Sequence, residues 1–355
     1  MHKPIPAPAA AGEPTSPCRR SNGAVPAMGP IVTMRRLMLA ALLALPGVGL
    51  RAAEQPIALA TPTGTLQGTL ATPDAPGTVP VVLIVAGSGP TDRDGNSAMV
   101  PGRNDSLRLL AQALSQAGFA SVRFDKRGIA ASTGAGHAEA DLRLEDFVDD
   151  AARWVETLDR DPRFRGVAIL GHSEGALIGL LAARRSSARA FVSVAGPADR
   201  ASAGLRRQLA GRLPQALAAR NEAILAALDA GRRVDDVPAA LLALYHPSVQ
   251  PYLISWLRYS PADELARLTI PCLVVQGDTD IQVEVADARA LQAARRDCSL
   301  QIVPGMNHVL KPVPADEARQ LASYADPTLP LAPEFVRGLA QFLDAALAGL
   351  PAARP

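Results

Sequence analysis

The chain has 355 residues, of which 48% are hydrophobic and 20% charged, so it holds ample apolar material for a globular core. Its formal net charge of +2 is unevenly distributed: residues 1–53 carry six basic side chains against one acidic side chain, a net of +5, which leaves −3 on the remainder. A mildly acidic body without basic tracts argues against nucleic acid as a partner.

The first 53 residues are expected to lie outside the fold. Residues 1–33 are rich in Pro, Ala and Gly without hydrophobic periodicity, which is typical of disorder or of an over-extended start site. From Met34 onward an arginine pair, a short apolar run and a small-residue exit form the pattern of a secretory signal, about residues 34–53. The apolar run is too short to span a bilayer, and no cysteine stands near the exit. We therefore expect an exported protein, periplasmic or secreted, without a stable membrane anchor.

Three cysteines occur, and the first of them, Cys18, lies in the leader. Cys272 falls in an apolar strand-like run and Cys298 follows a predicted helix. A disulfide between these two is compatible with an oxidising compartment, but the sequence does not decide it. No CxxC motif and no His/Cys cluster suggests a metal site, so we expect neither a metal nor another cofactor.

Strand-like and helix-like segments alternate along most of the chain. Residues 56–73 alternate polar and apolar side chains around two glycines, which predicts a hairpin. Residues 79–87 form a continuous β-branched run, typical of a strand buried on both faces. Further strands are predicted at 119–125, 166–171, 188–196, 271–277 and 299–305, and helices at 104–118 (capped by Asn104 or Asp105), 139–158, 174–185, 283–295 and 334–348. Such alternation predicts an α/β fold, a mostly parallel sheet with helices on both faces.

One segment breaks this rhythm. Residues 199–262 have the Leu/Ala spacing of helices and contain no strand candidate. We interpret them as an inserted helical cap between two parts of one core, residues 54–198 and 263–355.

The stretch LGHSEGALIG places Ser173 in the pattern Gly171-x-Ser173-x-Gly175, between a predicted strand and a predicted helix. Strand, sharp turn and helix form a nucleophile elbow, in which the serine Oγ projects above the sheet. The two glycines are needed because bulk at either position would clash in the turn. The helix N-terminus also favours negative charge beside the serine. The alternative is an ordinary helix cap flanked by glycines.

A nucleophilic serine needs a base, and five histidines are available. His308 lies in the loop after the last predicted strand, at the carboxyl edge of the sheet, where α/β active sites gather. His137 lies in a polar loop and His246 in the cap. We expect His172, inside the elbow, to lie on the wrong side of the turn to reach the serine Oγ easily.

The base in turn needs an acid that orients it. Asp278 and Asp280 both follow the predicted strand 271–277, and either could accept the Nδ1–H of His308. We favour Asp280 and assign Asp278 to the turn. The order serine, aspartate, histidine is the one that this fold demands. The alternative for both carboxylates is an Asx turn and a helix cap.

Chemistry at a carbonyl also needs hydrogen-bond donors for the oxyanion. One candidate is the backbone N–H of Glu174, directly after the serine. The other is the N–H of Ser88 in AGSGPTDRDGN, where Gly87 and Gly89 let the backbone turn inward. A phosphate-binding loop is the rival interpretation, but no G-K-S/T follows and Pro90 interrupts the glycines.

Five motifs in this order resemble those of bacterial α/β-hydrolases, exported esterases or acyl hydrolases related to the serine aminopeptidase and acyl-CoA thioester hydrolase groups: AGSGPTDRDGN, RFDKRGIAAS, GHSEGA, QGDTDIQV and MNHVLK. The resemblance covers about residues 55–350. It implies the α/β-hydrolase fold and a site made of the triad Ser173, Asp280 and His308, the oxyanion donors Ser88 and Glu174, and a loop that supports them through Asp125 and Arg127. Ala130 departs from the family's R-G-x-G-x-S pattern, which puts the local geometry of that loop in doubt.

These patterns predict a serine hydrolase that cleaves small-molecule esters of short to medium acyl chains through an acyl-enzyme, with the cap shaping the acyl or alcohol pocket. The same triad could cleave peptides, amides or thioesters. Aminopeptidase action would need an acidic cluster in the cap, where Asp235-Asp236 is the only pair, and export disfavours acyl-CoA. Outside the enzymes, a non-catalytic binding protein on a hydrolase scaffold is the alternative.

Overall fold

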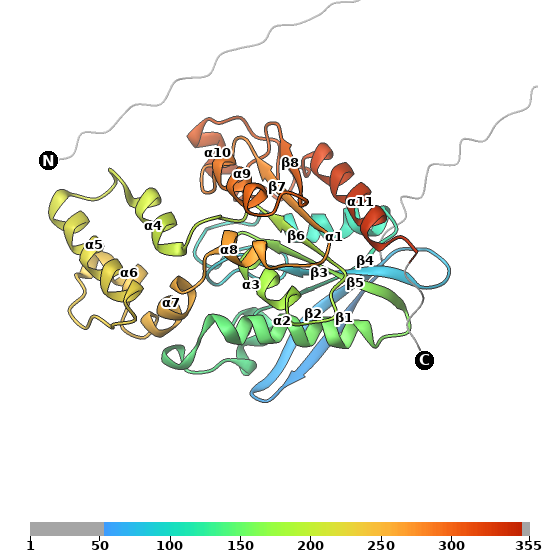
Figure 1. The fold of residues 1–355 in the computed structure, drawn as a ribbon, viewed down its shortest axis with the longest axis horizontal. Helices are drawn as coiled ribbons and strands as arrows, with labels where there is room; N and C mark the ends of the chain where they lie inside the picture. The colour runs from blue at the N-terminus through green and yellow to red at the C-terminus, as the bar shows by residue number, and fades with distance from the viewer. Residues whose placement is uncertain (1–52, 350–355) are drawn as a thin grey trace, which may run out of the picture. The chain divides into compact units, whose positions relative to one another are not determined.

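The computed structural model describes residues 53–349. The predicted extension and signal segment, residues 1–53, lie outside the described residues except for Ala53. An eight-stranded sheet forms the centre of the described part, in the order β1-β2-β4-β3-β5-β6-β7-β8 (Figure 1). The strands are β1 (Ala53–Thr61), β2 (Gly64–Thr72), β3 (Val79–Val85), β4 (Ala120–Phe124), β5 (Phe164–His172), β6 (Ala190–Val194), β7 (Cys272–Gly277) and β8 (Ser299–Val303).

The sheet is mostly parallel, as the alternation of strands and helices predicted. Only the amino-terminal hairpin differs: β1 pairs with β2, and β2 with β4, in the antiparallel sense. The other five pairs are parallel. The carboxyl ends of β3, β5, β7 and β8 therefore meet at one edge of the sheet, and the loops that leave these ends form the candidate site.

Helices cover both faces of this sheet (Figure 1). One face packs against α1 (Ser106–Gln116) and α11 (Pro333–Leu347), and the other against α2 (Leu144–Asp159), α3 (Glu174–Ala183) and α9 (Val285–Ala294). The β-branched run of β3 serves both cores at once. Val82 and Ile84 pack with the first set of helices, whereas Val81, Leu83 and Val85 pack with the second. A strand with apolar side chains on both faces is stable only in this sandwiched position.

The segment between β6 and β7 consists of helices and their connecting loops. The helical elements are α4 (Ala201–Leu209), α5 (Gln215–Asp229), the short turn η3 (Ala239–Leu241), α6 (Leu242–Tyr245), α7 (Gln250–Leu257) and α8 (Pro261–Ala266). Figure 1 shows α4 to α7 grouped beyond one end of the sheet and α8 back beside α3. The Ser255 hydroxyl of α7 accepts the backbone N–H of Leu144 at the start of α2, at 2.8 Å. On the α9 side, Arg207 of α4 pairs with Asp287 at 3.1 Å.

Two short elements were not predicted, the turn η1 (Ala130–Ala135) and the helix α10 (Glu317–Ser323). The helix predicted at 139–158 is divided into the short turn η2 (Glu139–Asp141) and α2, which begins only at Leu144. Of the two residues predicted to cap α1, only Asn104 accepts a backbone N–H of its first turn. Asp105 occupies the N-cap position in a left-handed conformation, with φ 51°, but its carboxylate pairs with arginines instead. The side-chain oxygen of Asn104 accepts the Ser106 N–H at 2.9 Å.

Cys272 at the start of β7 and Cys298 just before β8 form a disulfide, with their Cα atoms 4.9 Å apart. It joins two neighbouring parallel strands near their amino ends. Among residues 53–349, no helix is both long and apolar enough to cross a membrane.

Candidate active site

Ser173 is the single residue between β5 and α3, and its backbone is strained, with φ 55° and ψ −123°. The flanking glycines make this turn possible. A Cβ on Gly171 would lie 2.1 Å from the carbonyl oxygen of Gly175, and a Cβ on Gly175 would lie 2.3 Å from that of Val85. Side chains cannot occupy either space, so the glycine pattern is a steric requirement of the elbow.

His308 and Asp280 come from the loops after β8 and β7 and meet at this edge of the sheet. The Nδ1–H of His308 donates to Asp280 Oδ2 at 2.8 Å, and both side chains are almost fully buried. Asp280 also accepts the backbone N–H groups of Gln282 and Val283, at 2.7 and 3.1 Å. Burial acts to raise the pKa of Asp280, but His308 and these backbone donors outweigh it and hold the pKa below its ordinary value of 3.8. An ionised Asp280 fixes the ring of His308 with Nε2 free to accept a proton.

The second carboxylate of this loop has a different partner. Asp278 accepts the backbone N–H of Gly305 at 2.6 Å and so ties the loop after β7 to the loop after β8. The two loops approach closely, because a Cβ on Gly277 would lie 1.9 Å from the Met306 carbonyl oxygen. Of the two predicted candidates, Asp280 is therefore the one that the structure brings to His308.

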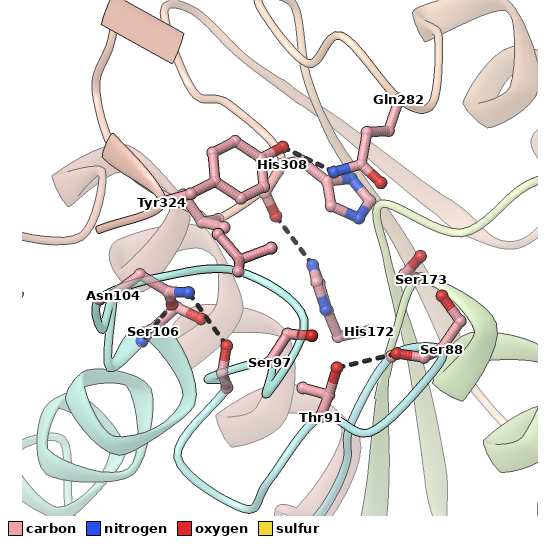
Figure 2. A pocket seen from close by; sticks show the side chains of 15 residues that line it. Ser88, Thr91, Ser97, Asn104, Ser106, His172, Ser173, Gln282, His308 and Tyr324 are labelled. Carbon is pink, nitrogen blue, oxygen red and sulfur yellow. Dashed lines mark hydrogen bonds between the residues drawn. The ribbon is translucent and has the colours of Figure 1, made fainter. Parts of the chain in front are cut away.

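The loop after β3 passes directly against the serine. A Cβ on Gly87 would lie 3.3 Å from Ser173 Cβ, and Gly89 has φ 68°, a value that favours glycine. Gly87, Ser88, Ser173 and His308 line one cavity of about 190 Å³ (Figure 2). The backbone N–H of Glu174 belongs to the first turn of α3, where no carbonyl within the helix accepts it.

Asp125 and Arg127 hold loops rather than line the cavity. The buried Asp125 accepts the backbone N–H of Arg93 at 2.7 Å and that of Ala131 at 3.1 Å, so it ties the loop after β3 to the loop after β4. Arg127 forms an ion pair with Asp150 of α2 at 2.6 Å. It also donates to the hydroxyl of Thr63 in the hairpin turn, at 2.8 Å. Arg127 thus anchors the far side of the same loop.

The departure from the family pattern at Ala130 coincides with an unusual backbone. Ala130 has φ 43°, in the left-handed region that glycine adopts without strain. The loop keeps this conformation with an alanine in the position where the resembling proteins have glycine.

His172 was expected not to reach the serine Oγ easily, and the structure adds something the sequence did not suggest, because this residue lies at the site. It lines the cavity, its Nε2–H donates to the His308 carbonyl oxygen at 2.8 Å, and the two ring centroids are 4.8 Å apart (Figure 2). Burial, with a contribution from His308, lowers its pKa to about 4, so the ring is neutral at pH 7. The other two histidines within residues 53–349 lie elsewhere: His137 contacts Arg127, and His246 contacts Ser248.

Neutral polar groups make up most of the remaining lining (Figure 2). They come from the loop after β3 and the start of α1 on one side, and from the loop after Asp280 and the end of α10 on the other. They are Thr91, Ser97, Asn104, Ser106, Gln282 and Tyr324, with Val100 and Val309 as the apolar side chains. Sequence reasoning missed this lining because α10 was not predicted and the loop residues carry no periodic signal.

The predicted role of the cap also needs a correction. None of the described residues of the segment 199–262 lines this cavity. The loops after β3, β7 and β8, with the ends of α1 and α10, line it instead. Within residues 53–349, no group of three or more His, Cys, Asp or Glu side chains is placed to hold a metal ion.

Comparison with known proteins supports the same fold. Residues 98–240 match the family described as serine aminopeptidase, S33. Esterase EstD of Thermotoga maritima is 28% identical over 249 residues, which cover 69% of this chain and 58% of EstD. The chain thus matches less than two thirds of that relative's length.

Two solved structures resemble the described sheet and helices at low sequence identity. Est1E of Butyrivibrio proteoclasticus with ferulic acid bound has a TM-score of 0.55 and 20% identity, covering 81% of this chain and 99% of that chain. The alpha/beta hydrolase GrgF of Penicillium sp. sh18 has a TM-score of 0.53 and 20% identity, covering 83% and 99%. The mostly parallel sheet, the strained elbow and these likenesses together show that the chain has the α/β-hydrolase fold.

Proposed function

We propose that the protein is a serine esterase that hydrolyses small-molecule carboxylic esters. The observation that carries this proposal is the buried His308–Asp280 pair at 2.8 Å, whose histidine lines one cavity together with the strained Ser173. The esterase activity named for EstD supports the same class of reaction.

In the proposed reaction, His308 Nε2 takes the proton of the Ser173 hydroxyl while Oγ attacks the ester carbonyl carbon. The negative charge that develops on the carbonyl oxygen is held by the backbone N–H groups of Ser88 and Glu174. The C–O bond to the alcohol then breaks, the alcohol leaves with the proton from His308, and Ser173 remains acylated. Water deprotonated by His308 attacks the acyl-enzyme, which releases the carboxylic acid and restores the serine.

The cavity favours a small, neutral substrate. Its volume of about 190 Å³ accommodates a short to medium acyl group or a small alcohol part. No carboxylate or ammonium side chain is among the described residues that line it. Neutral hydroxyl and amide groups suit an uncharged polar substrate, because such groups form hydrogen bonds without requiring a counter-charge.

The S33 family match raises aminopeptidase action as a second candidate. A free α-amine would need a nearby carboxylate. The one acidic pair of the cap lies in the loop before η3, where Asp236 pairs with Arg220 at 2.9 Å, and neither Asp235 nor Asp236 lines the cavity. The ester is therefore the better-supported substrate. Thioesters need the same triad and stay an alternative within the proposal.

We also propose that the protein is exported, to the periplasm or outside the cell. The signal-like segment at about 34–53 motivates this, and the Cys272–Cys298 disulfide suits an oxidising compartment. Amino-terminal sequencing of the protein recovered from the periplasm and the medium tests it. An intact leader on protein found only in the cytoplasm would contradict it.

The test of the activity compares the purified protein with Ser173→Ala on p-nitrophenyl esters of increasing acyl length. We expect turnover of the short esters, and a loss of at least ~10⁴-fold in kcat in the variant. A fluorophosphonate should label the wild type on the peptide that contains Ser173. Amino-acyl p-nitroanilides are run in parallel. Faster cleavage of the anilides would favour the peptidase, and no turnover by the folded protein would favour a binding scaffold.

A further inference from the structure

Lys126, in the loop after β4, is a buried cation that the proposed reaction does not use. Its side chain is 2% exposed. Nζ donates to the Gly87 carbonyl oxygen at 2.6 Å, lies 3.4 Å from Glu174 Oε2, and lies 5.1 Å from the centroid of the Phe147 ring. A buried ammonium is retained only where such partners replace its lost hydration. Two of these partners lie next to Ser173: Gly87 passes against its side chain, and Glu174 follows it in the chain.

The first of these contacts fixes the orientation of a peptide unit. The Gly87 carbonyl and the Ser88 N–H belong to one planar trans peptide, in which they point in opposite directions. When Lys126 holds the carbonyl oxygen, it therefore also fixes the direction of the Ser88 N–H, which lies in the same plane and points the opposite way. The next peptide is fixed as well, because the Thr91 hydroxyl donates to the Ser88 carbonyl oxygen at 2.8 Å. Both peptide units around Ser88 are therefore anchored.

The second contact reaches the other proposed oxyanion donor. Glu174 directly follows the serine, and its side chain is 3% exposed. One carboxylate oxygen faces Lys126 and the other accepts the hydroxyl of Tyr252. Burial, and then the Glu174 charge, raise the pKa of Tyr252 well above its ordinary value, so the phenol stays protonated and donates. The buried group thus consists of the Lys126 ammonium, the Glu174 carboxylate and the Tyr252 hydroxyl.

Tyr252 brings a third segment of the chain into contact with this group. It lies on α7, in the segment between β6 and β7, and its ring packs edge-to-face on Phe147 of α2, with centroids 5.7 Å apart at 71°. A continuous set of contacts therefore runs from α7 through Glu174 and Lys126 to the loop after β3. The helical segment does not line the cavity, yet it is joined to both backbone donors.

We propose that Lys126 is a positioning residue of the oxyanion hole. Its ammonium sets the Gly87–Ser88 peptide and the Glu174 carboxylate in one arrangement, and thereby aims both backbone N–H groups at the same point. The inference rests on the proposed esterase function. Lys126 acts through these neighbours and touches no substrate.

Lys126→Met tests this assignment, because it keeps the side-chain length but removes the donor and the charge. Loss of a single oxyanion donor lowers kcat by about 10²–10³-fold, and a misaimed pair should reach the lower end of that range. We expect kcat to fall about 10²-fold per serine titrated with a fluorophosphonate, with KM within about threefold of the wild type. The affinity for a trifluoromethyl ketone, which forms a tetrahedral adduct, should fall by the same factor as kcat/KM. A merely structural lysine would reduce the number of titrated serines and leave kcat per site unchanged.

A milder pair of variants covers the case in which Lys126→Met does not fold. Tyr252→Phe removes only the hydroxyl that holds Glu174. Tyr245→Phe is the matched control, since Tyr245 is a fully buried tyrosine of the same helical segment whose hydroxyl donates to Asn221 at 2.7 Å. We expect kcat to fall about three- to tenfold in Tyr252→Phe and to stay at the wild-type value in Tyr245→Phe.

The outcomes separate the two proposals. Wild-type kcat and analogue affinity in folded Lys126→Met, or equal kcat in the two tyrosine variants, would overturn the role of Lys126 and leave the esterase proposal standing. No ester turnover by the wild type would overturn both.

Discussion

The Nε2–H of His172 donates to the backbone carbonyl of His308 at 2.8 Å, although the two residues lie 136 positions apart in the chain. The residue before the serine thus supports the loop that carries the proposed base. The imidazole of His172 is buried, and its neutral form makes this bond without placing a second positive charge beside His308.

The first prediction concerns stability at low pH. The pKa of His172 is about 4 in the folded protein against an ordinary value of 6.5, so the unfolded chain binds the proton first as the pH falls. The contribution of the neutral His172 ring to the free energy of unfolding is fully present above pH 6.5. It declines by about 1.4 kcal/mol per pH unit down to pH 4, in total about 3 kcal/mol. The free energy of unfolding in urea at pH 7.5 and pH 4.5 should differ more in the wild type than in His172→Gln. The control is His246→Gln at an exposed position. Equal pH dependence in all three proteins would contradict the assignment.

A second prediction follows from the strained backbone of Ser173. A non-glycine residue with φ 55° and ψ −123° carries about 1–3 kcal/mol of strain. Ser173→Gly relieves that strain. The greater conformational freedom of glycine in the unfolded chain offsets about 0.5–1 kcal/mol of this gain in stability. Ser173→Ala keeps the strain. Both variants should be inactive, but Ser173→Gly should be more stable than Ser173→Ala by about 1 kcal/mol in urea unfolding. A less stable glycine variant would show that the elbow is not strained.

The elements of the core, and the pair that meets at the site, were predictable because each depends on local pattern and chain order. The β-branched run of β3 identifies a strand buried on both faces, and a parallel sheet places the ends of β7 and β8 side by side. That topology alone brings a residue after β7, Asp280, near a residue after β8, His308.

The parts that sequence reasoning missed depend on contacts between loops. Lys126 reaches Gly87, and Tyr324 reaches Gln282, across long chain separations that leave no periodic signal. For His172 the sequence predicted only that the ring would not reach Ser173 Oγ easily, and it gave no sign of the bond to the loop that carries His308. Its partner is a backbone carbonyl, which any residue at that position would have offered.

A third prediction concerns Ala130. Its φ of 43° is unfavourable for a residue with a Cβ, by roughly 1–2 kcal/mol, and costs glycine little. Ala130→Gly should therefore raise the free energy of unfolding by about 0.5–1 kcal/mol with kcat unchanged. Ala131→Gly is the control, because Ala131 is the exposed neighbour without a positive φ. It should be neutral or destabilising. Equal effects of the two substitutions would mean that the loop relaxes around Ala130.

The last prediction concerns Tyr324, which lines the cavity from the end of α10. Its hydroxyl accepts the Gln282 side-chain N–H at 2.7 Å, so its own proton remains available to a substrate. If the alcohol part of the ester carries hydroxyl groups, as in a sugar or glycerol acetate, Tyr324→Phe should lower kcat/KM for that ester by about two- to tenfold. The value for p-nitrophenyl acetate, which offers no hydroxyl there, should stay the same. Tyr259→Phe is the control, since that hydroxyl donates to Glu145 and does not line the cavity. An equal loss on both esters would indicate that Tyr324 acts on the loop around Gln282, and no loss on either would show that the alcohol part lies elsewhere.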